Sequence, residues 1–167
     1  MKNFEWCVYT YRHRKAFEYT VNKLIKDPEL KAEMLKRAKV HDVDKLKMYL
    51  VMDHIESQKK HVSESRHHLE NDNPKSYEDL VETVIDYECA PYTKPDKPLN
   101  AYDFTKKLLS MGAFGQETAD KLISIMHEFG IDSSYDLTKS DPEGMAYVQS
   151  IGEVTEEMIL DDIRENG

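Results

Sequence analysis

The spacing of apolar residues constrains this chain most strongly, because that spacing is helical along almost the whole sequence. Phe17, Val21 and Leu24 fall on one stripe of a first expected helix, together with His13. No stretch of useful length alternates between apolar and polar residues, as a half-exposed strand would. The sequence therefore predicts an all-α protein.

Capping residues indicate where several helices begin. The first helix is expected to end near Asp27, and Asp27 followed by Pro28 is typical of an N-cap with proline at the first helical position. Ser76 is expected to cap a helix over about 77–90. Asp44 is interpreted as the cap of an earlier helix, which follows the pair His41-Asp42.

Two further helices are expected over about 101–111 and 116–129. They would end at Gly112 and Gly130, because glycine adopts the left-handed conformation that commonly follows a helix. We therefore expect one helical domain over residues 1–130.

The last part of the chain, residues 131–167, differs in charge. It holds ten acidic and two basic side chains, whereas residues 1–130 hold 22 acidic and 21 basic ones. We interpret it as a short acidic helical extension whose charge is mainly a solvated surface. Removing it is expected to leave a folded domain. Because no basic stripe is present, nothing indicates binding to duplex nucleic acid.

The sequence also bears on location in the cell. No apolar run approaches the roughly 18–20 residues that a membrane span needs. Residues 1–6 lack the apolar stretch of a signal peptide. The two cysteines, Cys7 and Cys89, do not form a disulfide framework, so both are expected to be reduced thiols. We expect a cytoplasmic protein that does not associate with a membrane.

Potential metal ligands are concentrated in the first half of the chain. Six of the seven histidines lie within residues 13–68. Imidazole and carboxylate ligands together suit Zn, Mn, Fe, Ni or Co, and carboxylates also suit Mg. The candidate ligands, in chain order, are His13, His41, Asp42, His61, His67, His68 and Asp86.

The spacing of three histidines limits which of them can share a metal. His54, His61 and His68 are seven residues apart, and in one continuous helix His54 and His68 would be roughly 21 Å apart. A metal site therefore requires ligands from separate helices, or a break in the helix between His61 and His67. The serines at 63 and 65 make such a break plausible.

Each candidate also has an ordinary interpretation. On its expected helix, Asp86 lies with Asp79 and Glu82 opposite the apolar face, which is typical of a solvated stripe unless that face lines a polar pocket. His61 and His67 would fit a solvated face as well. Only the complete ordered set favours a metal site.

This order of ligands resembles the HD superfamily of metal-dependent phosphohydrolases, whose core is a helical bundle. Residues 41–45, His-Asp-Val-Asp-Lys, match the family's HD-x-x-K form. The segments HDVDK, HVSESRHH and ETVIDY are similar to a small HD-type family of bacteria and their viruses. The resemblance covers about residues 10–90. The glycine-tyrosine-proline signature of cyclic-dinucleotide phosphodiesterases is absent.

The resemblance implies an HD-type helical bundle and a role for each matching residue. The first metal would be bound by His13, His41, Asp42 and Asp86. A second metal would be bound by His61 and His67, with Asp42 bridging the two ions and His68 as the alternative to His67. Lys45 would contact substrate phosphate, and His68 and Arg66 are further candidates for substrate binding.

The function implied is hydrolysis of a nucleotide or another small phosphorylated molecule. One or two divalent ions (Mn, Fe, Ni, Co, Zn or Mg) would activate a water molecule, while Lys45 offsets phosphoryl charge. Asp42 and Lys45 are thus the expected catalytic residues, and Glu82 could orient a histidine ligand from behind. Two alternatives stay open: a non-catalytic metal- or nucleotide-binding regulatory module, and a di-iron HD-type oxygenase.

Overall fold

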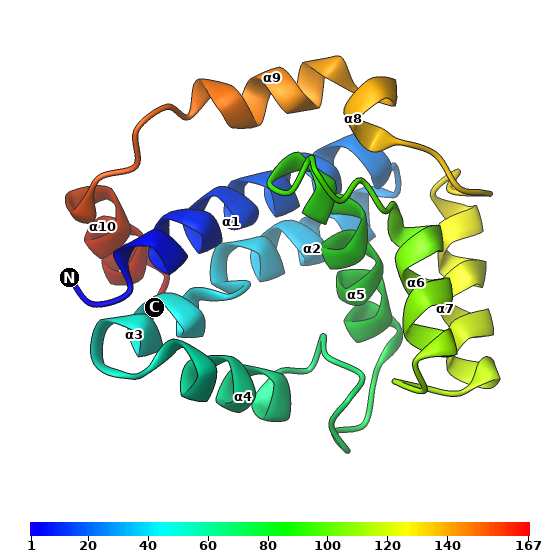
Figure 1. Ribbon diagram of the computed structural model, residues 1–167. Coiled ribbons are helices and arrows are strands. Elements are labelled where there is room, and N and C mark those ends of the chain that lie inside the picture. Colours follow the sequence, from blue (N-terminus) through cyan, green and yellow to red (C-terminus); the bar gives the residue numbers. More distant parts are fainter.

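The computed structural model describes residues 1–167 and contains no β-strand, which confirms the all-α prediction (Figure 1). No helix is both long and apolar enough to cross a membrane. The α-helices are α1 (Phe4–Leu24), α2 (Pro28–Val40), α3 (Val43–Val51), α4 (His54–Glu64), α5 (Tyr77–Cys89), α6 (Ala101–Ser110), α7 (Gln116–Glu128), α8 (Leu137–Ser140), α9 (Pro142–Ser150) and α10 (Glu156–Asn166). A 3-10 turn, η1 (Ala90–Tyr92), follows α5.

Two predicted caps are confirmed. The Asp27 carboxylate accepts a hydrogen bond from the backbone N–H of Leu30, and Pro28 is the first residue of α2. Ser76 and Asp79 form a reciprocal capping box at the start of α5. These local contacts satisfy backbone donors that a helix start leaves unpaired.

The predicted cap at Asp44 is wrong. Only two residues separate α2 from α3, and Asp42 is the residue before α3, with a left-handed φ of 59°. Asp44 lies in the first helical turn instead. Aspartate tolerates the left-handed conformation better than most residues, at a cost of roughly 1–2 kcal/mol. Such strain often occurs at functional sites.

The long helix α1 occupies the middle of the molecule (Figure 1). It packs against α2, α3, α5, α9 and α10. In the view shown, α9 lies along one side of α1, whereas α3 and α4 lie on the other side. Phe17, Val21 and Ile85 are fully buried in the main hydrophobic core between these helices. This packing positions α1, α3, α4 and α5 around a common interior space.

The segment after residue 130 packs on both hydrophobic clusters of the protein. Ile131, Leu137 and Val148 belong to the main core, while Val154 and Ile159 belong to a second core with Cys7 and Leu46. Most acidic side chains of the segment face outward, as expected for a solvated surface, but Asp141, Asp162 and the apolar face of the segment are buried. Residues 131–167 thus contribute to the same cores as the preceding residues.

A buried ion pair joins the C-terminal helix α10 to Arg14 on α1, and the same arginine contacts the end of α2. The guanidinium of Arg14 donates to both carboxylate oxygens of Asp162, each at 2.8 Å. The same guanidinium donates to the backbone carbonyls of Lys39 at 3.0 Å and of His41 at 2.5 Å. Helix α10 therefore helps to hold the turn that contains His41 and Asp42.

We predict that removing residues 131–167 abolishes the cooperative thermal transition, contrary to the expectation from charge alone. The five buried apolar side chains lost would each contribute about 1.5–3 kcal/mol, and typical net stabilities are about 5–15 kcal/mol. Circular dichroism during heating measures this transition.

A matched pair of point variants tests the packing of α10 without deleting part of the chain. Ile159→Ala should cost about 2–5 kcal/mol, because Ile159 is fully buried. Leu160→Ala on the neighbouring residue, which is 37% exposed, should cost much less. Equal stabilities of the two variants would contradict the packing of α10.

A second polar anchor lies between α9, α1 and η1. The carboxylate of Asp141 accepts hydrogen bonds from Tyr92 at 2.5 Å and from the backbone N–H of Gly144 at 3.0 Å, and pairs with Lys23 at 2.9 Å. Burial alone would raise its pKa, but these donors outweigh burial and lower the pKa of Asp141 from 3.8 to about 2. The folded state therefore favours the ionised form.

This shift predicts a pH-dependent contribution to stability. Because the pKa is lower in the folded state, the contribution is present above about pH 4 and is lost as the pH falls toward 2. Asp141→Asn should cost about 2 kcal/mol near neutral pH. Urea unfolding of both proteins from pH 7 to pH 2.5 should show their difference shrinking. A difference that stays constant with pH would rule out this role for the carboxylate.

Candidate metal centre

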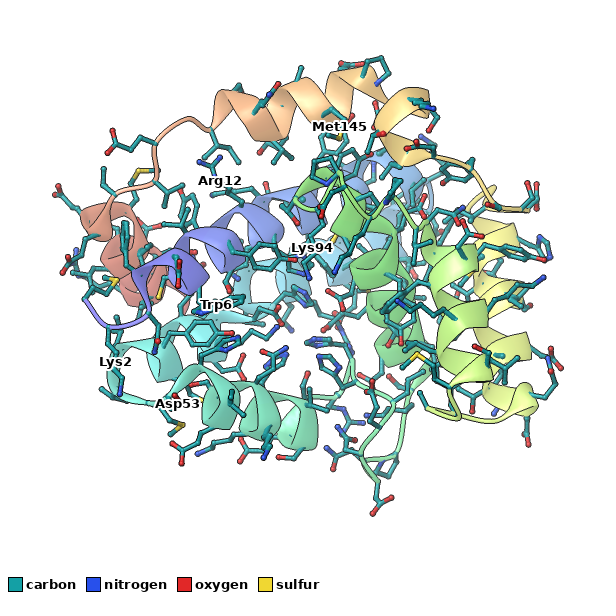
Figure 2. All side chains as sticks on the ribbon, viewed as in Figure 1. Lys2, Trp6, Arg12, Asp53, Lys94 and Met145 are labelled. Carbon is teal, nitrogen blue, oxygen red and sulfur yellow. The ribbon has the colours of Figure 1, made fainter.

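All six side chains predicted as metal ligands meet in the interior space between α1, α3, α4 and α5. Figure 2 shows that side chains from these helices crowd this space. The six come from five separate places in the chain: α1, the α2–α3 turn, α4, the loop after α4, and α5. Those residues are His13, His41, Asp42, His61, His67 and Asp86.

The first group consists of His13, His41, Asp42 and Asp86. Asp86 Oδ1 lies 2.8 Å from His13 Nε2 and 3.1 Å from His41 Nε2. Asp42 approaches the same two imidazoles, at 3.8 Å from His13 Nε2 and 3.7 Å from His41 Nε2. One potential ligand atom from each residue lies within 4.8 Å of the others, so the group could hold a metal ion.

The second group lies on the other side of Asp42. Asp42 Oδ1 is 3.1 Å from His61 Nε2 and 3.3 Å from His67 Nε2. The aspartate is thus the shared member of both groups, as a bridging carboxylate would be. His61, His67 and His68 also form a close set of three imidazoles that could hold a metal ion.

Two buried atoms in the second group lack a hydrogen-bond partner. They are Asp42 Oδ1 and His61 Nε2, which face each other at 3.1 Å without the alignment of a hydrogen bond. Buried polar atoms without a partner are rare and costly. A divalent cation ligated by both atoms would satisfy them, so the residues present fit a metal at this position.

A helix break between His61 and His67, one of the two arrangements that the histidine spacing allows, is present. Helix α4 ends at Glu64, and the Ser65 hydroxyl lies 2.7 Å from His67 Nδ1. The chain then turns back, so that His67 faces Asp42, whereas His68 pairs with Glu70 at 3.4 Å. This geometry favours His67 over His68 as the partner of Asp42.

Carboxylates behind the histidines orient them. Glu82 Oε2 lies 2.7 Å from His67 Nδ1 and 3.3 Å from His41 Nδ1, so the Nε2 atom of each ring faces the centre. Asp44 Oδ2 contacts His61 Nδ1 at 2.7 Å in the same way. Carboxylates that contact the other ring nitrogen are typical partners of metal-binding histidines. Glu82 thus occupies the position expected from the sequence.

The electrostatics of the centre favour positive charge. Burial disfavours a charged imidazole, but Asp42, Asp86 and Glu82 outweigh this effect and raise the pKa of His41 to about 9. Asp42 and Glu82 likewise raise the pKa of His67 to about 10 against the effect of burial. Burial would also raise the pKa of Asp42, yet His41 and Lys45 lower it. Buried carboxylates at this density favour bound protons or cations.

The polar face of α5 is part of this centre rather than a solvated stripe. Asp79 is completely buried, Glu82 is 9% exposed, and Asp86 contacts His13 and His41. Asp79 accepts from Arg37 at 2.8 Å. In the folded protein, the polar face of α5 is covered by α1, α2 and the loop after α4.

A cavity of about 370 Å³ opens beside the first group. His13, Asp42 and Asp86 line its inner end, together with Lys45, whose Nζ lies 3.2 Å from Asp42 Oδ2. His68 lines it as well. Lys45 and His68 therefore lie where a ligand of the cavity would contact them.

Arg66 does not line this cavity. Its guanidinium pairs with Asp79 at 3.0 Å and donates to the carbonyl of Pro74, so it borders a smaller cavity on the other side of the histidines. Its contacts stabilise the start of α5 rather than a site for substrate. Substrate binding by Arg66 remains a prediction from the sequence alone.

The two remaining histidines and both cysteines lie outside the candidate ligand groups. His54 stacks on Trp6 with 3.8 Å between ring centroids, and exposed His127 pairs with Asp132. Cys7 and Cys89 are buried free thiols. Burial raises the pKa of both thiols, as expected for cysteines that pack in the interior.

Sequence reasoning did not identify several residues at the site. Asp44 was assigned to a helix cap, although its position two residues after Asp42 allows it to reach a neighbouring helix. Lys94, Lys97 and Lys107 line the cavity and were not considered. No local pattern marks these lysines, because they come from a loop and a helix outside the ligand motif.

Comparison with protein-family models, curated proteins and solved structures found no match to this chain.

The two groups predict separable effects on metal content. Replacing His61 and His67 together by alanine should lower the number of bound ions by roughly half, because only the second group loses its imidazoles. Elemental analysis of the purified protein measures this number. His127→Ala is the matched control, since His127 is exposed and distant in the sequence from both groups. An unchanged metal content in the double variant would leave a single-ion centre.

Proposed function

We propose that this protein is a metal-dependent phosphohydrolase that acts on a small phosphorylated molecule. The observation that carries the proposal is the position of the ligand groups. His13, Asp42 and Asp86 of the first group line the inner end of an accessible cavity, and Lys45 lies beside the shared aspartate. A purely structural metal site would be enclosed by its ligands, whereas a catalytic site leaves access for substrate.

The residues of the chain divide into two roles. Imidazole and carboxylate groups are suited to hold cations, while the protonated ammonium of Lys45 cannot bind a metal and is suited to a phosphoryl oxygen. Burial would lower the pKa of Lys45, but Asp42 and Asp86 outweigh burial and raise it above its ordinary value. Lys45 therefore remains charged near neutral pH.

A bound divalent ion would lower the pKa of a coordinated water and offset charge on phosphoryl oxygens. His13, His41 and Asp86, with Asp42, would hold one ion, and His61 and His67 a second. Glu82 and Asp44 fix the histidine rings, so that little rearrangement accompanies binding. Lys45 would hold the phosphoryl group against the inner end of the cavity.

To test the proposal, the metal-loaded protein is assayed for hydrolysis of a panel of phosphate esters. The panel contains aryl phosphates, mononucleotides, dinucleotides and cyclic nucleotides, each with Mn, Ni, Co or Mg. We expect release of phosphate from at least one substrate. No release from any of them, by protein shown to contain metal, would favour a non-catalytic binding module. Iron with a coloured oxidised form would favour an oxygenase.

A further inference from the structure

The outer part of the cavity carries an unexpected concentration of positive charge in a chain with a net charge of −9. Lys94, Lys97 and Lys107 line it in addition to Lys45 at the inner end. None of these three outer lysines has an ion-pair partner within 4.0 Å. The one carboxylate in the outer part, Glu70, pairs with His68.

The three lysines are placed by two different elements. Lys94 and Lys97 belong to one tight turn, in which the backbone N–H of Lys97 donates to the carbonyl of Lys94 at 3.0 Å. Prolines at 91, 95 and 98 restrict the backbone on both sides of this turn. Lys107 lies on α6, one turn after Phe104, and both line the cavity. The cations thus face one space from a rigid loop and a helix.

Lys94 is connected to the first ligand group through Tyr9. Its Nζ lies 5.0 Å from the centre of the Tyr9 ring, and Tyr9 stacks on His13 with 6.2 Å between ring centroids. Figure 2 labels Lys94 beside α1 and α5. Burial, followed by repulsion from Lys45 and Lys97, lowers the pKa of Lys94. Lys94 is therefore repelled by both Lys45 and Lys97.

The wall between the two charged ends is apolar. Tyr87, Leu99 and Phe104 line it, with the ring of Phe104 packed edge-on against Tyr87 at 4.7 Å between centroids. Such a wall suits a flat ring or an aliphatic segment of a ligand. With Lys45 at the inner end and three lysines at the outer end, the cavity is suited to a ligand that carries an anionic group at each end.

We propose that Lys94, Lys97 and Lys107 form a second anion subsite, and that the ligand of this cavity is a small molecule with two separate phosphoryl groups and a flat aromatic ring. This inference rests on the proposed function only for the position of the first phosphoryl group, at Lys45 and the metal ligands. The second group lies at the outer lysines and is not cleaved.

The test compares two probes that differ by one phosphoryl group. Adenosine 3′,5′-bisphosphate and adenosine 5′-monophosphate are offered to the metal-loaded full-length protein. If the probes are hydrolysed, selectivity is the ratio of their kcat/KM values. If they are not hydrolysed, selectivity is the ratio of their dissociation constants, measured by equilibrium dialysis. The wild type should prefer the bisphosphate by about tenfold or more.

Single lysine variants show which side chains cause the preference for the bisphosphate. Lys94→Ala, Lys97→Ala and Lys107→Ala should each lower the selectivity ratio by about two- to fivefold, as expected for an accessible charged contact. Lys106→Ala is the matched control on the same helix, because Lys106 lies over the Tyr102 ring and does not line the cavity. Selectivity should also decrease as salt concentration rises.

The outcomes separate this inference from the proposed function. Hydrolysis with a selectivity ratio near one, or a ratio that none of the three variants changes, would overturn the second subsite and leave the phosphohydrolase proposal intact. Selective binding that depends on Lys94 and Lys107, without hydrolysis, would support the subsite and count against catalysis.

Discussion

Replacing Asp42 by alanine is expected to remove all tightly bound metal, which is the largest effect of any single ligand change. Asp42 is the one residue shared by both ligand groups, with Oδ2 near His13 and Oδ1 near His61 and His67. His41→Ala should remove the first ion, because His61 and His67 remain on the other side of Asp42. Elemental analysis of each purified variant measures the loss.

Two further variants separate the loss of a metal ligand from a disturbance of the turn that carries it. Asp42→Asn keeps the size of the side chain and its tolerance for a left-handed φ, so loss of metal from it cannot be attributed to a disturbed turn. Glu82→Gln should weaken binding by about 10- to 100-fold, because Glu82 is the carboxylate partner of two histidines and also pairs with Arg37 at 3.5 Å. Asp161→Ala is the control at an exposed carboxylate. Stoichiometric metal in Asp42→Ala and His41→Ala, with helical circular dichroism intact, would disprove the assignment.

Replacing Lys45 by alanine is expected to lower kcat/KM for any phosphate ester that the protein hydrolyses by roughly 100- to 1000-fold. Loss of one contact that stabilises the transition state commonly costs about 2.7–4 kcal/mol. Metal content should change less than activity, because an ammonium group is not a ligand. Steady-state kinetics and elemental analysis on the same preparation separate the two effects.

A neighbouring lysine on the same helix provides the control. Lys47 is exposed on α3, contacts the carbonyl of Gly167 and does not line the cavity. Lys47→Ala should therefore retain the wild-type rate. Full activity of Lys45→Ala would remove Lys45 from the site while leaving the metal centre and the enzyme proposal in place. Loss of metal from Lys45→Ala would instead show that Lys45 stabilises the metal centre through its 3.2 Å contact with Asp42.

Local structure could be predicted because its causes lie within a few residues of one another. The cap at Asp27, the capping box of Ser76 and Asp79, and the positive φ of Gly112 and Gly130 each depend on contacts across about one helical turn. The apolar spacing of α1 likewise predicted its buried face. The fold class followed from these local patterns.

The membership of the candidate centre could also be read from the sequence, through the order of histidines and aspartates. The helix break before His67 was one of two arrangements that distance allowed, since His54 and His68 on one long helix could not have met. The sequence could not show how the polar face of α5 is covered. Asp86 and Glu82 have the periodicity of a solvated stripe, and only the packing of α1 and α2 against that face turns it into a buried site.

Only the tertiary structure decided which distant residues complete the site. Asp44 contacts His61 from a neighbouring helix, Lys94 and Lys107 meet in one cavity from a loop and from α6, and Arg14 connects Asp162 to the turn at His41. These contacts join residues 13 to 148 positions apart, and no local pattern encodes such separations. The sequence by itself determined the helices and the candidate ligands. Helix packing determined the cavity beside them, because packing sets which polar faces are buried together.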